Sequence, residues 1–493
     1  MTAALAPDVD VAALLARIGV VPARITADSR RVRAGDAFAA YPGTRSDGRA
    51  FIADAVRAGA SAVLWEASGF QWNPAWQAAN HAVDGLAARL GAIADAIYGR
   101  PSQSLWMVGV TGTNGKTSCS QWIASCLERC GRRSAVIGTL GNGLAGALAP
   151  AEGTTPDAAL LHETLARFKA EGAAAVAMEV SSHGLDQGRV NAVAFDVALF
   201  TNLTRDHLDY HGTMAAYGAA KARLFAWPGL STCVINADDA FGRSLVDVVR
   251  KGSCRLLTYG FAGADIVATG IATTADGVAM TVATPWGKGE LRAPVVGAFN
   301  AANVLGVLGV LLASSVPLDA ALAALAAIEP PPGRMQRLGG GALPLVVVDY
   351  AHSPDALQKV LTALRPAVLP PHELVCVFGC GGDRDTGKRP EMGAAAGRLA
   401  DRVVVTSDNP RSEDPAAIAS AVVAGIRTTS NRRWSVELDR ARAIGAAIDA
   451  AHPGDVVLVA GKGHEDCQEQ NGVRRPFSDV GVAAAALAAR SGA

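Results

Sequence analysis

The stretch LWMVGVTGTNGKTS, residues 105–118, joins an apolar run to a glycine-rich turn. Leu105–Val110 has the length and composition of a buried β-strand, and the residues from Lys116 onward have the periodicity of a helix. In such a strand, turn and helix, backbone N–H groups at the helix N-terminus bind phosphates. We therefore expect nucleotide phosphates at Gly112, Thr113, Asn114, Gly115, Lys116, Thr117 and Ser118.

The turn departs from the common phosphate-loop pattern GxxxxGK[ST]. Val110 occupies the position of the first glycine, and glycines stand at 109, 112 and 115 instead, which implies a shortened loop. In such loops the lysine reaches the terminal phosphates and the next hydroxyl binds Mg²⁺, so we expect these roles for Lys116 and Thr117. The alternative is a glycine-rich turn with an incidental lysine, which the flanking strand and helix disfavour.

Further strand-like runs predict an α/β fold. Ala173–Val180, Asp196–Leu203 and Thr232–Asn236 are apolar and are separated by stretches of helical periodicity. Alternating strands and helices predict a mostly parallel sheet covered by helices, with ligands at the carboxyl ends of the strands. A second group of strand candidates follows: Leu345–Tyr350, Leu374–Phe378, Arg402–Thr406 and Val456–Ala460.

Two turn-rich segments divide the chain. Tyr98–Ser102 contains Gly and Pro, and Glu329–Gly333 contains three consecutive prolines, which cannot continue a helix. A length of 493 residues also favours several domains over a single core. We expect three domains, at residues 1–98, 99–332 and 333–493.

Composition argues against several classes of function. Lys plus Arg and Asp plus Glu are equal at 45 each, so the charge favours neither nucleic acid nor a membrane surface. The N-terminus lacks the segments of a secretory signal, and the longest apolar stretch, Val304–Val316, is interrupted by Gly and Ser. The eight Cys form no CxxC pair, as is typical of reduced thiols. We expect a cytoplasmic monomer without nucleic-acid or membrane partners.

Polar segments follow two of the strand candidates. Glu179 ends an apolar run within MEVSSHGLDQGR, residues 178–189, where a carboxylate is well placed to bind a hard cation. The run TNLTRDHLDYH, residues 201–211, has two Asp and two His among its last six residues. A carboxylate at a strand end is also commonly a cap or a surface charge, and a solvated loop can have the second composition. These segments alone leave both interpretations open.

Together with GTNGKT at 112–117, the motifs resemble those of the Mur ligases and the related folylpolyglutamate synthases. The resemblance runs from about Asp28 to Cys467 with the motifs in the expected order. It implies that Lys221, in YGAAKARLF at 217–225, is carbamylated by CO₂ to N6-carboxylysine. The implied Mg²⁺ ligands are Thr117, Glu179 and His207, and the implied catalytic residues are Lys116, Glu179, His207 and Lys221.

The resemblance implies an ATP-dependent reaction. A substrate carboxylate would attack the γ-phosphate to give an acyl phosphate, and an amine would then displace phosphate, so the protein would mainly position groups and neutralise charge. Asn300, in GAFNAAN at 297–303, would approach adenine, while Arg334 would face the phosphates and Asp349 the ribose. ATP would lie between the second and third domains, and domain closure would assemble the site.

The implied architecture is an N-terminal α/β UDP-binding domain, a central P-loop ATPase-like domain with a parallel sheet, and a C-terminal Rossmann-like domain. The first substrate would be a UDP-linked muramyl dipeptide, UDP-N-acetylmuramoyl-L-alanyl-D-glutamate, a precursor of peptidoglycan. Its implied contacts are Ser29, Thr44, Arg45, Ser46, Thr154, Thr155, Ser181, Gln187 and Arg189.

The sequence DNPR, residues 408–411, is the form that this family shows when the incoming amino acid is meso-diaminopimelate. Arg411 can bind the distal carboxylate with two parallel hydrogen bonds, and lysine lacks that carboxylate. A site built around one polar group can reject analogues that lack it by about 10⁴-fold. The implied contacts of the amino acid are Arg384, Asp408, Asn409, Pro410, Arg411, Gly461 and Glu465.

Three alternatives remain. Folate polyglutamylation shares the shortened loop but requires neither the N-terminal uridine motifs nor DNPR. Addition of lysine is disfavoured by Arg411, although mixed substrate use stays open. A non-catalytic nucleotide-binding scaffold is disfavoured because Lys116, Glu179, His207 and Lys221 are all present.

Overall fold

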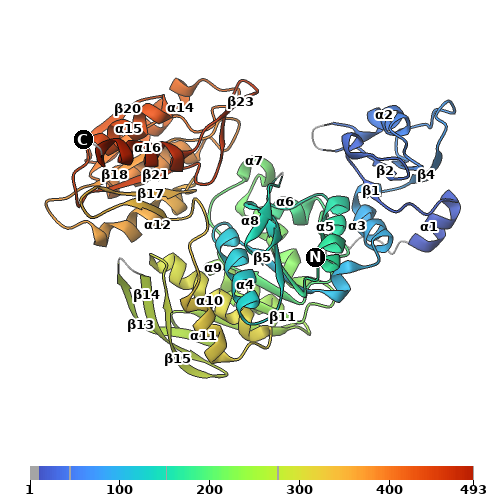
Figure 1. Cartoon of the computed structure of the whole chain (residues 1–493), viewed down its shortest axis with the longest axis horizontal. Helices are drawn as coiled ribbons and strands as arrows, with labels where there is room; N and C mark the ends of the chain where they lie inside the picture. Colours follow the sequence, from blue (N-terminus) through green and yellow to red (C-terminus); the bar gives the residue numbers. More distant parts are fainter. Residues whose placement is uncertain (1–9, 44–45, 152, 275–276, 492–493) are drawn as a thin grey trace.

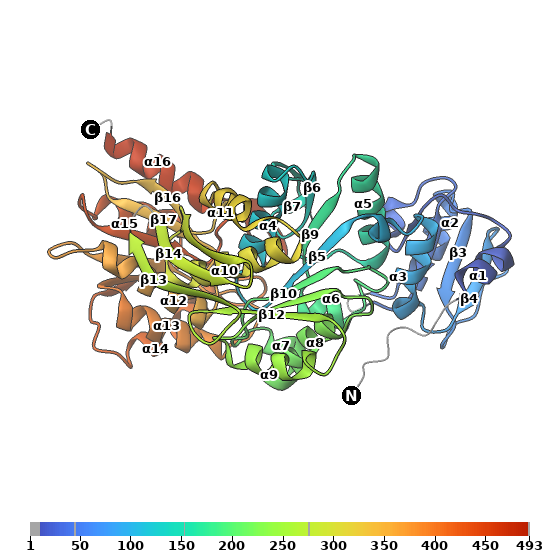
Figure 2. The ribbon, with the colours of Figure 1, turned by 90° about the horizontal axis from the view of Figure 1, so that it is seen from below.

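The computed structural model describes residues 10–43, 46–151, 153–274 and 277–491. In these ranges the strands form sheets of four, eleven and six strands, and a two-stranded ribbon. The three sheets follow one another along the chain and in space, with the eleven-stranded sheet between the other two (Figure 1 and Figure 2). This α/β architecture with largely parallel sheets confirms the predicted fold class.

The N-terminal sheet is parallel throughout and consists of β1 (Ile25–Thr26), β2 (Ala37–Ala40), β3 (Ala62–Glu66) and β4 (Ala79–Val83). Helix α3 (Leu86–Ile97) packs against α5 (Ala158–Ala170), which belongs to the central part of the chain. A Cβ at Gly91 of α3 would lie 2.3 Å from the carbonyl oxygen of Asn191, so glycine permits this close packing.

The central sheet places β5 (Trp106–Thr111) between β9 (Ala175–Glu179) and β10 (Val197–Phe200), and all three strands are parallel. In register, Val110 lies opposite Glu179, and Thr111 lies opposite Phe200. The segments that follow these strands are therefore neighbours at one edge of the sheet. The parallel part continues through β6 (Ser134–Gly138), β11 (Thr232–Asn236) and β12 (Arg255–Gly260).

Helices cover both faces of the central sheet. On one face, α4 (Lys116–Arg129) and α10 (Ala298–Ala313) pack into one apolar core. α10 is buried along most of its length, which explains why its sequence is apolar on nearly all sides. α5 contributes to the core on the opposite face.

Both edges of the central sheet are antiparallel, which the sequence did not predict. One edge is formed by β7 (Gly141–Leu144) and β8 (Ala147–Ala149). The other is formed by β13 (Ile266–Thr274), β14 (Gly277–Thr284) and β15 (Gly287–Ala293). Along β14 buried and less buried residues alternate, so these strands lack the continuous apolar run by which the inner strands were found.

The C-terminal sheet has six strands in the order β16-β17-β21-β18-β19-β20. Its inner strands β17 (Leu345–Asp349), β18 (Leu374–Phe378), β19 (Arg402–Val405) and β21 (Val456–Ala460) are parallel and agree with the predicted strands to within one residue. The outer strands are β16 (Gln336–Gly339) and β20 (Trp434–Val436). The helices around this sheet are α12 (Pro354–Leu364), α13 (Lys388–Leu399), α14 (Pro415–Ile426), α15 (Arg440–Asp449) and α16 (Asp479–Ser491).

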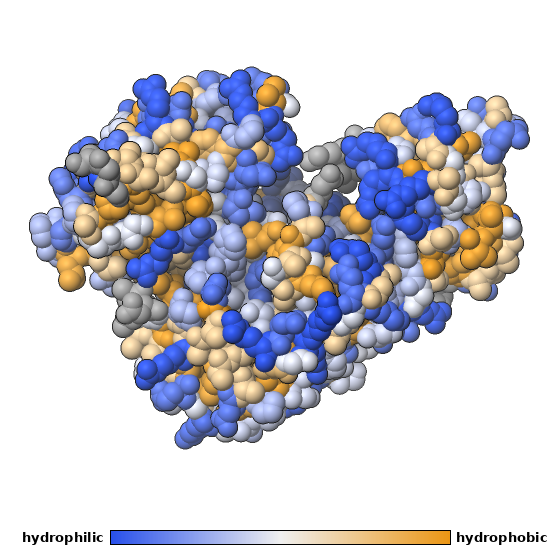
Figure 3. Space-filling view, in the orientation of Figure 1, coloured by the Kyte–Doolittle hydropathy of each residue, from blue (hydrophilic) through white to orange (hydrophobic). Residues whose placement is uncertain are grey.

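A hairpin of β22 (Cys467–Gln470) and β23 (Val473–Pro476) follows β21. The surface is hollowed between the N-terminal and C-terminal parts of the molecule (Figure 3). No helix among the described residues is long and apolar enough to cross a bilayer.

Candidate active site

The phosphate-loop candidate has the conformation that its glycines predict. Gly112 and Gly115 have φ values of 150° and 91°, and Gly115 caps the N-terminus of α4. A Cβ at Gly112 would lie 1.9 Å from Thr201 Oγ1, so the loop can pass this close only as glycine. The amide of Asn202 accepts from the Asn114 N–H at 3.0 Å and donates to its carbonyl at 3.0 Å, which holds the loop on the segment after β10.

Two lysine side chains lie on this loop. Lys116 Nζ donates to the carbonyl oxygens of Gly112 at 3.0 Å and Thr113 at 2.9 Å. Lys221, on α8 (Met214–Ala222), is buried, and its Nζ donates to Gly112 at 2.8 Å and lies 4.4 Å from the ring centroid of Tyr217. Burial, followed by the charge of Lys116, sets the pKa of Lys221 well below its usual range. This setting favours the uncharged amine of Lys221.

Glu179 is buried at the end of β9 and faces α4. Its Oε2 accepts from the Thr117 hydroxyl at 3.0 Å and from the Thr139 hydroxyl at 3.1 Å, and its Oε1 accepts from the Thr139 N–H at 2.8 Å. Arg334 Nη2 donates to Thr117 Oγ1 at 3.2 Å. The structure therefore brings together Thr117, Glu179 and Arg334, which are far apart in the sequence.

His207 lies in the segment between β10 and α7 (Leu208–His211) with a φ of 54°. Burial, together with the neighbouring His183, lowers its pKa to about 3, so its imidazole is neutral near pH 7 and can bind a metal ion. The rings of His183 and His207 are 5.0 Å apart. Although burial opposes ionisation of Asp206, contacts with His352 and His207 hold the pKa of that carboxyl far below its usual range.

The residues present fit Mg²⁺ bound with the help of a nucleotide. In the described ranges no three His, Cys, Asp or Glu side chains surround a common metal position. Thr117 Oγ1 and Glu179 Oε2 nevertheless lie 3.0 Å apart at the phosphate loop. Mg²⁺ in nucleotide sites is commonly held by one or two protein oxygens and by phosphates, and this donor set suits that mode.

A cavity of about 210 Å³ lies on one side of the phosphate loop. Arg189 lies beside it and donates to Gln187 Oε1 through Nε at 2.8 Å and to the Thr155 carbonyl through Nη1 at 2.8 Å. The Thr155 hydroxyl in turn donates to Ser181 Oγ at 3.1 Å. The lining residues are Lys116, Thr154, Thr155, Ser181, Ser182, His183, Arg189, His207 and Lys221, seven of which were predicted from the sequence.

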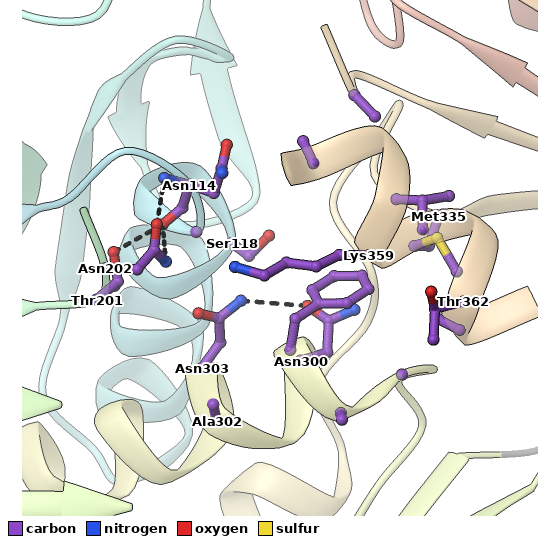
Figure 4. Close-up of a pocket in the computed structure, with 18 of the residues that line it drawn as sticks. Asn114, Ser118, Thr201, Asn202, Asn300, Ala302, Asn303, Met335, Lys359 and Thr362 are labelled. Carbon is purple, nitrogen blue, oxygen red and sulfur yellow. Dashed lines mark hydrogen bonds between the residues drawn. The ribbon is translucent and has the colours of Figure 1, made fainter. Parts of the chain in front are cut away.

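A second cavity, of about 610 Å³, lies between the central sheet and the C-terminal part of the chain. Figure 4 shows Asn114 and Ser118 on one side, Asn300 and Asn303 below, and Lys359 extending from α12. The Asn300 side chain donates a hydrogen bond to the Val296 carbonyl and accepts one from the Asn303 amide, and these bonds fix its orientation. Six predicted nucleotide contacts line this cavity: Asn114, Gly115, Ser118, Asn300, Arg334 and Asp349.

Side chains connect the central and C-terminal parts beside this cavity. Asn114 Nδ2 donates to Asp355 Oδ2 at 3.2 Å. Arg205 pairs with Asp385 and Glu391, both at 3.2 Å. These contacts join the segments after β5 and β10 to the C-terminal sheet and its helices.

The predicted amino-acid contacts gather at the carboxyl ends of β19 and β21. Arg411 has a φ of 52°, and its Nη1 donates to the Gly382 carbonyl at 2.7 Å. Asn409 Nδ2 donates to Glu465 Oε2 at 2.8 Å. Gly461 is positioned close to Asp408, because a Cβ there would lie 2.6 Å from Asp408 Oδ2. Pro410 is buried in the same loop, and Arg384 is exposed nearby, on the loop of Gly381 and Gly382.

The predicted contacts of the uridine diphosphate, in the N-terminal part of the chain, are not joined to either cavity by the described residues. Thr44 and Arg45 lie outside the described residues, Ser29 is partly buried, and Ser46 is exposed. Neither Ser29 nor Ser46 lines the two cavities. Burial, followed by the charge of Asp157, raises the pKa of the neighbouring Tyr41 to about 12, while the charge of Arg189 opposes that rise.

Sequence reasoning missed several residues of the site. Asn202, Asn303 and Lys359 line the larger cavity, and Arg205 pairs across to the C-terminal part. The strand before residues 201–211 was a signal that could have indicated Asn202, since loops after parallel strands carry ligands. Lys359 lies on an amphipathic helix and carries no local signal.

The chain matches known families and proteins along nearly its whole length. Residues 23–98 match the family described as Mur ligase family, catalytic domain, residues 110–311 the Mur ligase middle domain, and residues 333–463 the Mur ligase, glutamate ligase domain. A curated protein of Chromobacterium violaceum, UDP-N-acetylmuramoyl-L-alanyl-D-glutamate–2,6-diaminopimelate ligase, is 53% identical, and the match covers 98% of this chain and 97% of that protein.

A Pseudomonas aeruginosa protein of the same name is 54% identical over 94% of this chain and 95% of its own. A solved structure of a ligase with this name has a TM-score of 0.67 at 37% identity and covers 95% of both chains. By sequence and by fold, the chain belongs to the Mur ligase family.

Proposed function

We propose that this protein is an ATP-dependent amide ligase that adds meso-2,6-diaminopimelate to the D-glutamate of UDP-N-acetylmuramoyl-L-alanyl-D-glutamate. The reaction releases ADP and phosphate and extends a peptidoglycan precursor. The two relatives described above, both named UDP-N-acetylmuramoyl-L-alanyl-D-glutamate–2,6-diaminopimelate ligase, match this chain over nearly their full length. We also propose that the protein works in the cytoplasm.

One observation supports the reaction most strongly: the phosphate loop separates the two cavities. Asn114 and Gly115 line the larger cavity, while Lys116 lines the smaller one beside Arg189. A nucleotide in the larger cavity would therefore direct its terminal phosphate toward a carboxylate held in the smaller one. Two reactants held in this way react as if at very high local concentration.

In the first step, a carboxylate oxygen of the D-glutamate attacks the γ-phosphorus, the bond to the β-phosphate oxygen breaks, and an acyl phosphate and ADP result. Arg189 orients the anionic substrate with Gln187, Thr154, Thr155 and Ser181, and Lys116 and Arg334 neutralise charge on the phosphates. Thr117, Glu179 and His207 would hold Mg²⁺, which would supply further positive charge.

Lys221 has a second proposed role as N6-carboxylysine. Its uncharged amine attacks the carbon of CO₂ and loses a proton, which leaves a carbamate. The buried position and the low pKa of Lys221 support this assignment because the uncharged amine is the nucleophile. The carbamate would place an anion beside Lys116 in place of the uncharged amine.

In the second step, an amine of diaminopimelate attacks the acyl carbon and loses a proton, and phosphate leaves. Arg411 binds the distal carboxylate, assisted by Arg384, and Glu465 meets an ammonium group near Gly461. Asp408, Asn409 and Pro410 shape the loop that holds Arg411. Asn300 and Asp349 bind the adenosine of ATP, and Ser29, Thr44, Arg45 and Ser46 bind the uridine diphosphate.

We assign these roles to three domains, at residues 1–98, 99–332 and 333–493. The ion pairs of Arg205 with Asp385 and Glu391 support closure of the third domain onto the second. Closure brings the amino-acid loop toward the acyl phosphate and excludes water from it.

The test is phosphate release by the purified protein with ATP, Mg²⁺ and the UDP-linked dipeptide, with meso-diaminopimelate or L-lysine as the amine. Release that depends on diaminopimelate, with a UDP-linked tripeptide as product, is the expected result. Glu179→Gln serves as a control that should lose at least about 100-fold in kcat because it removes a charge at the phosphate loop. Release with lysine alone would refute the assignment of diaminopimelate, and no release with either amine would refute the proposed reaction.

A further inference from the structure

Lys462 is the first residue after Gly461 and is fully buried. Its Nζ donates to Asn409 Oδ1 at 3.0 Å and to Glu465 Oε2 at 2.7 Å. A buried ammonium group is unfavourable unless it is paired and hydrogen-bonded. Here its partners are the side chains of two residues that we propose to lie at the amino-acid site.

A second buried cation nearby has a different set of partners. Arg440 is fully buried and pairs with Asp479 through two hydrogen bonds of 2.7 Å. It also donates to the carbonyl of Ser407 at 3.2 Å and that of Ala460 at 2.9 Å. Arg440 therefore hydrogen-bonds to backbone carbonyls after β19 and at the end of β21, whereas Lys462 hydrogen-bonds to side chains.

The contacts of Lys462 fix the orientation of the Asn409 amide. Oδ1 accepts from Lys462 Nζ and from the Glu469 N–H at 3.0 Å, so it must face these two donors. The Nδ2 group consequently faces Glu465 Oε2 at 2.8 Å. Without Lys462, the amide would lose one of the two donors that determine its orientation.

Glu465 is held by one oxygen only. Oε2 receives both Lys462 Nζ and Asn409 Nδ2, while the hydrogen bonds among the described residues leave Oε1 without a donor. The side chain is 29% exposed, so the carboxylate borders the surface of the site. A carboxylate fixed by one oxygen can offer the other to an ammonium group without first losing rotational freedom.

We propose that Lys462 is a positioning residue that fixes Glu465 and Asn409 for binding of an ammonium group of the incoming amino acid. The inference rests on the proposed function, because it takes these two residues as part of the amino-acid site. Lys462 itself is buried and acts through Glu465.

The first test is Lys462→Met. When Glu465 and Asn409 are less firmly held, binding of the amino acid is weakened equally in the ground state and in the transition state. The KM for diaminopimelate should therefore rise by about 10- to 100-fold. The kcat and the KM values for ATP and the UDP-linked dipeptide should change by less than about threefold. An unchanged KM for diaminopimelate, or an equal rise in all three KM values, overturns the proposal.

A double-mutant cycle separates positioning from general loosening. If Lys462 acts through Glu465, the KM for diaminopimelate in Lys462→Met/Glu465→Gln should match that of Glu465→Gln alone. Effects that multiply would mean that Lys462 acts independently of Glu465, and the proposal would fail. If Lys462→Met does not fold, Lys462→Arg gives the same comparison, since it keeps the buried cation but places its donors differently.

Asp455, the residue just before β21, offers a matched control. It is buried at the opposite end of β21 and accepts from the N–H groups of Glu373 and His452. Asp455→Asn should lower the melting temperature without raising the KM for diaminopimelate. A rise like that of Lys462→Met would show that any loosening of this sheet has the effect. If the wild-type protein shows no turnover of diaminopimelate, the proposed function itself has failed, which is a separate outcome.

Discussion

Lys116 and Lys221 donate to the same carbonyl oxygen, that of Gly112, at 3.0 Å and 2.8 Å. Two ammonium groups on one buried acceptor repel each other, and burial lowers the pKa of both lysines. Both lysines line the smaller cavity, but Lys221 is buried and Lys116 is only partly buried. The geometry therefore favours a charged Lys116 for phosphates and an uncharged Lys221 that can react with CO₂.

Replacement of Lys221 by Met should stabilise the protein near pH 7 in buffer free of CO₂. Because the folded-state pKa of Lys221 lies below 10.5, the unfolded chain binds more protons between those two values, and wild-type stability rises with pH across this window. The variant lacks this dependence. The free energy of unfolding of the variant should exceed that of the wild type by on the order of 1 kcal/mol at pH 7, and this difference should shrink toward pH 10. Melting curves at pH 7, 8.5 and 10 test this, and an advantage that grows with pH would contradict it.

Replacement of His464 by Phe should reduce the loss of stability in acid. Burial, followed by the charge of Arg334, lowers the pKa of His464 to about 4, and its Nδ1 is buried without a hydrogen-bond partner in the described structure. The unfolded chain therefore binds more protons between pH 6.5 and 4, and stability falls as the pH decreases through this window. Between pH 7.5 and 5 the wild type should lose up to about 2 kcal/mol more than the variant. Urea unfolding at both pH values measures the difference, and equal losses would rule out His464 as its source.

The inner strands could be predicted because each is a continuous apolar run buried on both faces. β11, β18 and β21 have the predicted bounds. The antiparallel edges could not be predicted in the same way, since their burial alternates and their pairing partners are set by the fold.

The candidate site was only partly accessible from the sequence. Glu179 could be suspected because a carboxylate at a strand end suits a cation, but only the resemblance indicated Lys221, an ordinary helical lysine by its spacing. The contacts of Lys462 with Asn409 and of Arg205 with Asp385 join residues that are 53 and 180 positions apart. Such contacts depend on the tertiary fold, and no local sequence pattern predicts them.

Arg205→Ala should weaken closure of the C-terminal part onto the central part. Arg205 is 41% exposed, so its ion pairs with Asp385 and Glu391 are screened by solvent and contribute no more than about 1 kcal/mol. We expect the KM for diaminopimelate to rise by about twofold to fivefold, with a smaller rise in 0.5 M salt, where the wild-type pairs are already weakened. Steady-state kinetics at low and high salt measure this. A salt-independent effect would mean that Arg205 acts other than through these pairs.

Arg411→Lys should reduce the discrimination between diaminopimelate and lysine. Arg411 keeps a left-handed φ of 52° because the hairpin holds its backbone: its N–H donates to Glu469 at 3.1 Å, and its carbonyl accepts from Asn471 at 2.7 Å. The substituted side chain would keep the charge but lose the planar pair of donors that matches a carboxylate. The ratio of kcat/KM for diaminopimelate to that for lysine should fall by about 100-fold or more, mainly through the KM for diaminopimelate.

The measurement is kcat/KM for both amino acids in the wild type and in Arg411→Lys. Because the hairpin contacts involve the backbone of Arg411, the substitution should leave the loop in place and remove only the side-chain hydrogen bond to the Gly382 carbonyl. A matching loss with both amino acids would indicate that the loop had moved. An unchanged ratio would mean that another group, such as Arg384, recognises the distal carboxylate, and that Arg411 serves only to shape the loop.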